Sequence, residues 1–169
     1  MRSRVMRASL VTLLAASAVS VVAAEQSPDL KRLDYFAGKW RVDADVKATP
    51  LSAASTASGT DECEWFANLH MVCKAEAKGA AGQYKTMRVM SHMPALKQYS
   101  AYTVDSLGFG SLGAGTFQAN TWTFTTELAG SKLRVTMKTS PDSYTAVSEY
   151  AGPDGKWVQT SEIKATRMK

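Results

Sequence analysis

The feature that most constrains this chain is a change of hydrophobic period at Gly38. Before it, Leu30, Leu33 and Phe36 recur at helical spacing behind a Ser-Pro-Asp start that is typical of a helix N-terminus. After it the period becomes two. Over 39–47 every second residue is apolar, which is the pattern of a half-buried strand. The sequence therefore predicts one short helix followed by β-structure.

The same alternation continues to the end of the chain. The predicted strands are 39–47, 55–65, 69–78, 83–92, 97–105, 108–118, 121–128, 132–138, 142–150 and 156–167, of which the sixth is weakened by its glycines. Most of the gaps are too short for a parallel crossover, which needs a dozen or more residues. We expect an all-β fold, an antiparallel up-and-down β-barrel of about 8–10 strands whose one end is capped by the helix, because closure removes sheet edges. A β-sandwich is the alternative, although the run of short connections favours the barrel.

The first 24 residues differ from the rest. Three arginines within the first seven residues precede an apolar run, Leu10 to Val22, and small residues follow it. This pattern predicts a secretory signal peptide over 1–24 and a barrel domain over 25–169. The run of about 13 residues is shorter than the ~20 needed by a membrane anchor, the alternative reading. We therefore expect a periplasmic or secreted protein with no membrane span after cleavage. Without this segment the chain has 17 Lys and Arg residues and 15 Asp and Glu residues. This near balance of charge gives no indication of nucleic-acid binding.

Two cysteines, Cys63 and Cys73, are the only ones in the chain. A hairpin that turns at 67–69 would set them opposite each other, and export would place them in an oxidising compartment. The sequence therefore predicts a disulfide, with two buried free thiols as the alternative. A zinc site or a thiol–disulfide catalyst is not expected, because there is no C-x-x-C motif and there are only two histidines.

The entry into the first strand carries a family resemblance. A helix that leads into Gly38-Lys39-Trp40 resembles the opening of the lipocalin-like (calycin) barrels, in which the Trp often stacks under an Arg of the last strand. That resemblance implies that Trp40 and Arg167 meet at the closed end of the barrel, where a cation–π contact would stabilise them. More closely, the chain resembles the DUF1579 family of bacterial proteins, which has no established function. The matching segments are the G-x-W start, 99–108, 115–117 and 150–167.

Several sequence motifs bear on cofactor and catalytic chemistry. The segment 108–113 matches G-x-G-x-x-G, but strand-like sequence follows where a dinucleotide site needs a helix. Barrel-corner glycines or a mobile portal loop explain it better. His70 and His92 are the only histidines, and a haem-binding barrel resembling nitrobindin would need one nearer the C-terminus. Ser91 and His92 are strand neighbours that point to opposite faces, so they cannot pair as nucleophile and base. We expect no cofactor and no metal.

Aromatic residues and methionines are spread over most of the predicted strands. A barrel of eight or more strands can leave room for a ligand among them, and small alanines on several strands favour such a cavity. By strand alternation the inward candidates are Trp65, Met71, Met87, Tyr99, Trp122, Phe124, Met137, Tyr144 and Trp157. The expected partner is a small hydrophobic or amphipathic molecule. It would enter at the end opposite Trp40, past the segment 48–56, which is long, small and uncharged.

Two other functions stay open from the sequence. A filled interior would indicate an envelope interaction protein. A hydrolase or isomerase would need titratable groups paired at the barrel mouth, and Asp105, Glu149 and Glu162 are more simply explained as solvated carboxylates. No catalytic residue is assigned.

Overall fold

A computed structural model of the chain describes residues 26–49, 53–80, 82–128 and 130–169. The predicted signal peptide, 1–24, and the middle of the predicted portal segment, 50–52, lie outside the described residues.

The predicted helix begins at Ser27, whose side chain accepts a hydrogen bond from the amide of Leu30 at 3.2 Å. It comprises a turn of α-helix, α1 (Pro28–Lys31), and a 3-10 turn, η1 (Arg32–Phe36). The strands are β1 (Gly38–Val46), β2 (Ser55–Phe66), β3 (His70–Gly79), β4 (Gly82–Met93), β5 (Gln98–Asp105), β6 (Gly110–Gln118), β7 (Thr121–Leu128), β8 (Ser131–Ser140), β9 (Ser143–Ala151) and β10 (Trp157–Arg167). A short 3-10 turn, η2 (Pro94–Leu96), joins β4 to β5.

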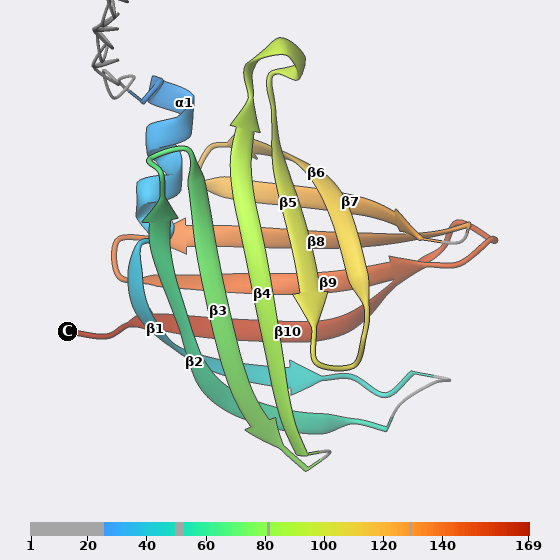
Figure 1. Ribbon diagram of the computed structural model, residues 1–169. Coiled ribbons are helices and arrows are strands. Elements are labelled where there is room, and N and C mark those ends of the chain that lie inside the picture. The colour runs from blue at the N-terminus through green and yellow to red at the C-terminus, as the bar shows by residue number, and fades with distance from the viewer. Residues whose placement is uncertain (1–25, 50–52, 81, 129) are drawn as a thin grey trace, which may run out of the picture.

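These strands form one closed antiparallel barrel (Figure 1). Each strand pairs with its neighbours in sequence, and β1 pairs with β10 to complete the ring, from Trp40 opposite Arg167 to Val46 opposite Ser161. The predicted up-and-down barrel is therefore confirmed, and the sandwich alternative is wrong. Closure leaves none of the ten strands as an unpaired edge.

The helical segment covers one end of the barrel (Figure 1). It buries Leu30, Leu33 and Phe36, the residues whose spacing predicted it, against the inner faces of the strands. On the same end, β2 turns into β3 at Ala67-Asn68, where both residues have positive φ as tight hairpin turns require. That turn sets Cys63 directly opposite Cys73, and the two form a disulfide, as predicted.

The glycines of the G-x-G-x-x-G segment have structural roles. Gly108, with φ +90°, lies in the turn between β5 and β6, as barrel-corner glycines do. On β6, two residues after the motif ends, a Cβ added to Gly115 would lie 2.4 Å from the ring of Phe124. The absence of a side chain at Gly115 therefore leaves room for the Phe124 ring inside the barrel.

Candidate ligand-binding lumen

The half of the barrel under the helix is solidly packed. Inward-facing residues at this end form one buried cluster with Leu33 and Phe36. The cluster contains Trp40, Cys63, Met71, Cys73, Met90, Tyr99, Ala101, Trp122, Phe124, Met137, Tyr144, Ala146 and Ala165. Trp122 lies at the centre of this group, with ring centroids 4.7 Å from Tyr99 and 5.4 Å from Phe36. This end of the barrel is core.

The other half is open. On β1 the inward row runs from buried Trp40 to Val42, Ala44 and Val46, which are only partly buried, while the outward residues between them are exposed. The same change occurs along the other strands, at Ala57 and Gly59, Ala75 and Ala77, Thr86, Thr103, Ser111, Thr126, Leu133 and Val135, Ser148, and Ser161 and Ile163. Because these side chains point inside a closed ring, solvent reaches them through the rim opposite the helix. We call the space that they line the lumen.

The wall of the lumen is mostly uncharged. In the described residues it consists of aliphatic side chains and hydroxyl groups, and the phenol rings of Tyr84 and Tyr150 lie in the same inward rows at the rim. Among the described residues of these inward rows, the charged side chains are Asp61 and Arg88 at the inner end and Asp105 at the rim. His92 and Arg167 lie further toward the helix.

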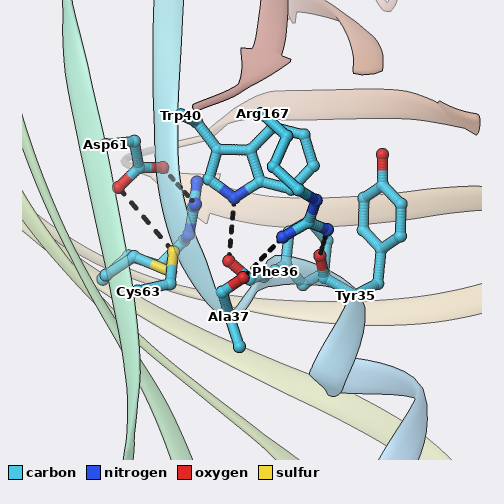
Figure 2. The surroundings of a disulfide bond; sticks show 9 residues. Tyr35, Phe36, Ala37, Trp40, Asp61, Cys63 and Arg167 are labelled. Carbon is cyan, nitrogen blue, oxygen red and sulfur yellow. Dashed lines mark hydrogen bonds and ion pairs between the residues drawn. A yellow bond between two sulfur atoms is a disulfide. The ribbon is translucent and has the colours of Figure 1, made fainter. Parts of the chain in front are cut away.

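A polar group lies where the lumen meets the packed core. Asp61 on β2 stands opposite Trp40 on β1 and is only 5% exposed. Its Oδ2 accepts a hydrogen bond from Nη2 of Arg88 at 3.1 Å. Arg88 comes from β4, so its side chain reaches past β3 inside the barrel. Figure 2 shows Asp61 beside Cys63 and the indole of Trp40.

Tyr144 adds a hydroxyl from the opposite wall. Its ring packs on Trp40, with centroids 5.1 Å apart, and it belongs to β9. Burial raises the pKa of Tyr144 to about 12, although the charge of Arg88 and a hydrogen bond from it act in the other direction. The phenol is therefore a neutral hydrogen-bond donor at ordinary pH. We refer to Asp61, Arg88 and Tyr144 as the polar floor of the lumen.

Three buried side-chain nitrogens have no hydrogen-bond partner in the described part of the chain: Nε of Arg88, Nδ1 of His92 and Nε1 of Trp122. A buried donor without an acceptor costs about 1–3 kcal/mol. Such groups are uncommon in folded proteins unless an ion, water or ligand supplies the acceptor.

The cysteines do not provide a metal site. One oxygen of Asp61 and the sulfurs of Cys63 and Cys73 lie within 4.8 Å of one another. Both sulfurs are held in the disulfide, however, and it is thiolate that binds metals.

The helix end of the barrel is closed by Arg167. Its guanidinium lies 4.2 Å from the ring centre of Trp40 and donates hydrogen bonds of 2.7 Å to the carbonyls of Tyr35 and Ala37 (Figure 2). The indole nitrogen of Trp40 donates to the carbonyl of Phe36 at 2.9 Å. These contacts fix the helical segment to the first and last strands, so the lumen has its opening at the other end.

The rim carries an ordered turn between β5 and β6. The Oδ1 of Asp105 accepts hydrogen bonds from the amides of Leu107 and Phe109, and its Oδ2 accepts one from the hydroxyl of Tyr84 at 3.0 Å. Desolvation raises the pKa of this carboxyl, but these hydrogen bonds outweigh it, so the pKa lies below its ordinary value. The side chains of Leu107 and Phe109 are exposed at the tip.

The structure places the sequence-predicted residues unequally. Met71, Tyr99, Trp122, Phe124, Met137 and Tyr144 are buried inside the barrel, and all of them belong to the packed half. Trp65 is also packed against this core, and its indole nitrogen donates to Asp34 at 2.7 Å.

Two of the inward assignments are wrong. Met87 lies opposite outward-facing Lys74 and is 39% exposed, because β4 carries apolar residues on both faces and its alternation is ambiguous. Trp157 lies on the outer wall, 36% exposed, under the guanidinium of Arg134 at 4.1 Å. The register of β10 against β9 shifts between Gln159 and Ser161. Beyond such a bulge, residues that would have pointed into the barrel point outward, and Trp157 is one of them.

The carboxylates considered for catalysis do not gather as a group. Glu149 is on the outer wall, where its Oε2 accepts from Nε of Arg134 at 2.8 Å. Glu162 stands opposite Asp45 in an outward row of β10 and β1. Asp105 is held by the rim turn.

Sequence reasoning missed Asp61 and Arg88. Asp61 shares a row of period two with Trp65, which was an inward candidate, so that row was the available signal. No comparable signal marked Arg88, because the face of β4 was misassigned.

A closed antiparallel barrel of ten strands, with a helix over one end and a lumen open at the other, defines the lipocalin-like class of protein. Within it, the chain belongs to the DUF1579 family, described as a protein of unknown function, whose model matches residues 25–167.

Comparison with solved structures supports the fold. An S-type phycobiliprotein lyase, CPES from Guillardia theta, is similar with a TM-score of 0.60 at 13% identity, over 82% of this chain and 92% of that one. Rv2717c from M. tuberculosis is similar with a TM-score of 0.66 at 9% identity, over 86% of this chain and 100% of that one. No curated protein matches the sequence. In the part of the chain that the structure describes, no helix is long and apolar enough to span a bilayer.

Proposed function

We propose that this protein binds a small apolar or amphipathic molecule in the lumen. The observation that carries the proposal is the change along every inward row, from buried residues under the helix to partly exposed residues toward the rim. A barrel that served only as a scaffold would gain stability by filling this space with larger side chains. Here the positions are held by small residues such as Ala44, Ala57, Ala75 and Ala77.

The wall suits a ligand with a substantial apolar part. Ligand sites are mostly apolar concavities in which a few polar groups fix orientation. The described residues of the lumen have that composition, since an aliphatic and hydroxyl-bearing wall meets charge at the polar floor and at Asp105. The packed core beneath it keeps the site rigid, which reduces the entropy lost on binding.

Blocking the lumen tests the proposal. Ala75→Phe would place a ring among the lumen residues, whereas Lys74→Phe, its strand neighbour, would place the same ring on the outer wall. We expect an environment-sensitive apolar dye to bind the native protein, and Ala75→Phe to weaken binding at least tenfold while Lys74→Phe leaves it unchanged. Both variants are checked for folding by circular dichroism. Dye binding that survives Ala75→Phe unchanged would place the site elsewhere.

We also propose that the protein acts outside the cytoplasm, after cleavage between Ala24 and Glu25. The sequence pattern of residues 1–24 supports this, and the disulfide suits an oxidising compartment. Mass spectrometry of the protein recovered from a periplasmic extract should give a chain that begins at Glu25. A full-length chain in the cytoplasmic fraction would contradict the proposal.

A further inference from the structure

We infer that the lumen receives its ligand polar end first, and that this end is a carbonyl-bearing head group, a carboxylate or an ester, which accepts hydrogen bonds from Arg88 and Tyr144. The inference rests on the proposed function and specifies the ligand of the same site.

The first argument is the accessibility of Arg88. Its residue position faces inward, opposite Cys73 on β3 and Thr103 on β5, yet its side chain is 26% exposed. Because the helix end is packed, the lumen is the route by which anything can reach this side chain. Asp61 occupies Nη2, Tyr144 accepts a further hydrogen bond from the guanidinium, and Nε has no partner among the described residues. A guanidinium presents five donors in a rigid fork, so the ion pair with Asp61 leaves donors over.

The second argument is the balance of donors and acceptors at the polar floor. Arg88 is a donor alone, and the phenol of Tyr144 stays protonated. The acceptors among the three residues, the carboxylate of Asp61 and the hydroxyl oxygen of Tyr144, are both engaged by Arg88. A carbonyl oxygen complements this arrangement. An ammonium head group, which can only donate, would leave Arg88 unsatisfied and would have to compete with it for Asp61.

The third argument is the position of the polar floor along the lumen. It lies at the inner end, level with Trp40, while Ala44, Val46 and Ala57 line the wall toward the rim. An amphipathic molecule can satisfy both regions at once when its head lies beside Arg88 and its chain runs outward along the aliphatic wall. In the opposite orientation an apolar chain end would cover a buried, incompletely satisfied guanidinium, which is unfavourable.

The test compares ligands of equal chain length. Binding of dodecanoate, methyl dodecanoate and dodecylamine to the native protein is measured by displacement of the apolar dye. We expect both carbonyl compounds to bind at least tenfold more tightly than the amine. If the dye binds but none of the three displaces it, this inference is overturned and lumen binding stands; if the dye itself does not bind, the proposed function fails as well. If the amine binds equally well or better, the inference is overturned and lumen binding stands.

A matched pair of double variants locates the selectivity. Asp61→Leu/Arg88→Met replaces the inner ion pair by apolar residues of similar size, a change that buried ion pairs often tolerate. Glu149→Leu/Arg134→Met does the same to the ion pair on the outer wall. We expect the first to reduce the carbonyl-to-amine preference below threefold and the second to leave it unchanged. Full selectivity in a folded Asp61→Leu/Arg88→Met variant would overturn the inference.

Orientation is measured without any substitution. In the native complex with dodecanoate, nuclear Overhauser contacts from the CH2 next to the carboxylate should reach the ring of Tyr144, and those from the terminal methyl should reach Ala44 and Val46. Contacts from the terminal methyl to Tyr144 and from the CH2 next to the carboxylate to Ala44 and Val46 would overturn the inference, whether or not the double variants fold.

Discussion

The guanidinium of Arg167, the last residue of β10, lies 4.2 Å from the ring centre of Trp40 in β1. The two residues are also direct partners in the pairing that closes the barrel. One contact thus joins the first strand, the last strand and, through the carbonyls of Tyr35 and Ala37, the helical segment.

Removing either member of this pair should destabilise the fold by different amounts. Trp40→Ala deletes a fully buried indole and should lower the free energy of unfolding by about 3–5 kcal/mol. Arg167→Ala removes two charge-assisted hydrogen bonds and the stacking, at a cost of about 2–3 kcal/mol. Urea titrations measure both, and Arg41→Ala, exposed on the outer wall, is the control, with an effect within about 0.5 kcal/mol. An Arg167→Ala variant as stable as that control would show that the contact contributes nothing.

The disulfide should stabilise the barrel modestly. Cys63 and Cys73 are 10 residues apart, and chain-entropy models give a loop of this size about 2–3 kcal/mol. The double variant Cys63→Ala/Cys73→Ala should therefore stay folded and unfold at lower urea concentration. Peptide mapping of the native protein, with and without reduction, checks the linkage itself. Two alkylatable thiols in native oxidised material would disprove it.

The rim turn should respond to acid. Hydrogen bonds lower the pKa of Asp105 in the folded state, so its carboxylate stabilises the fold above the unfolded pKa, near 4, and this contribution is lost as pH falls through the folded pKa. Tyr84→Phe removes one of these bonds and should raise the pKa of Asp105, measured by carbon NMR of its carboxyl. The native protein, measured under the same conditions, is the reference. An Asp105 pKa that does not move in Tyr84→Phe would contradict the role given to the phenol.

Packing around Gly115 predicts a pair of coupled effects. A Cβ at this position would lie 2.4 Å from the ring of Phe124, so Gly115→Ala should cost about 1–3 kcal/mol through overpacking. Phe124→Leu removes the ring edge and should recover part of that loss in the double variant. Thermal unfolding of the four proteins forms a double-mutant cycle. Additive effects would mean that the two positions do not compete for space.

Much of the fold follows from local pattern. The change of period at Gly38 marks the end of the helical segment, and turn residues mark the strands to within a few positions. The disulfide followed from a hairpin of the right length. What failed was the assignment of faces on β4 and near the start of β10, where Met87 and Trp157 lie outside. Apolar residues on both faces of β4 and the bulge in β10 are local irregularities that period-two reasoning cannot detect.

The candidate site was harder to predict for a different reason. Large apolar residues such as Trp122 and Met137 were expected to line the cavity, yet they fill the half of the barrel under the helix. Residues that line empty space are small and leave no strong pattern, as Ala44 and Ala75 show. The pairing of Asp61 with Arg88 depends on strands that are not neighbours, and it becomes visible once the barrel is closed.

The pairing of β1 with β10 has a consequence for how the molecule reaches its native state. The ring cannot close until the last eleven residues of the barrel, 157–167, have been made and have met a strand formed near the beginning. Contacts between residues that are far apart in the sequence slow folding. Until β10 pairs, the unfinished sheet exposes two unpaired edge strands, β1 and β9. A chain that loses β10 would keep nine tenths of its strands and still have no enclosed interior. It should self-associate through those edges, so C-terminal truncation is more damaging here than the number of lost residues suggests.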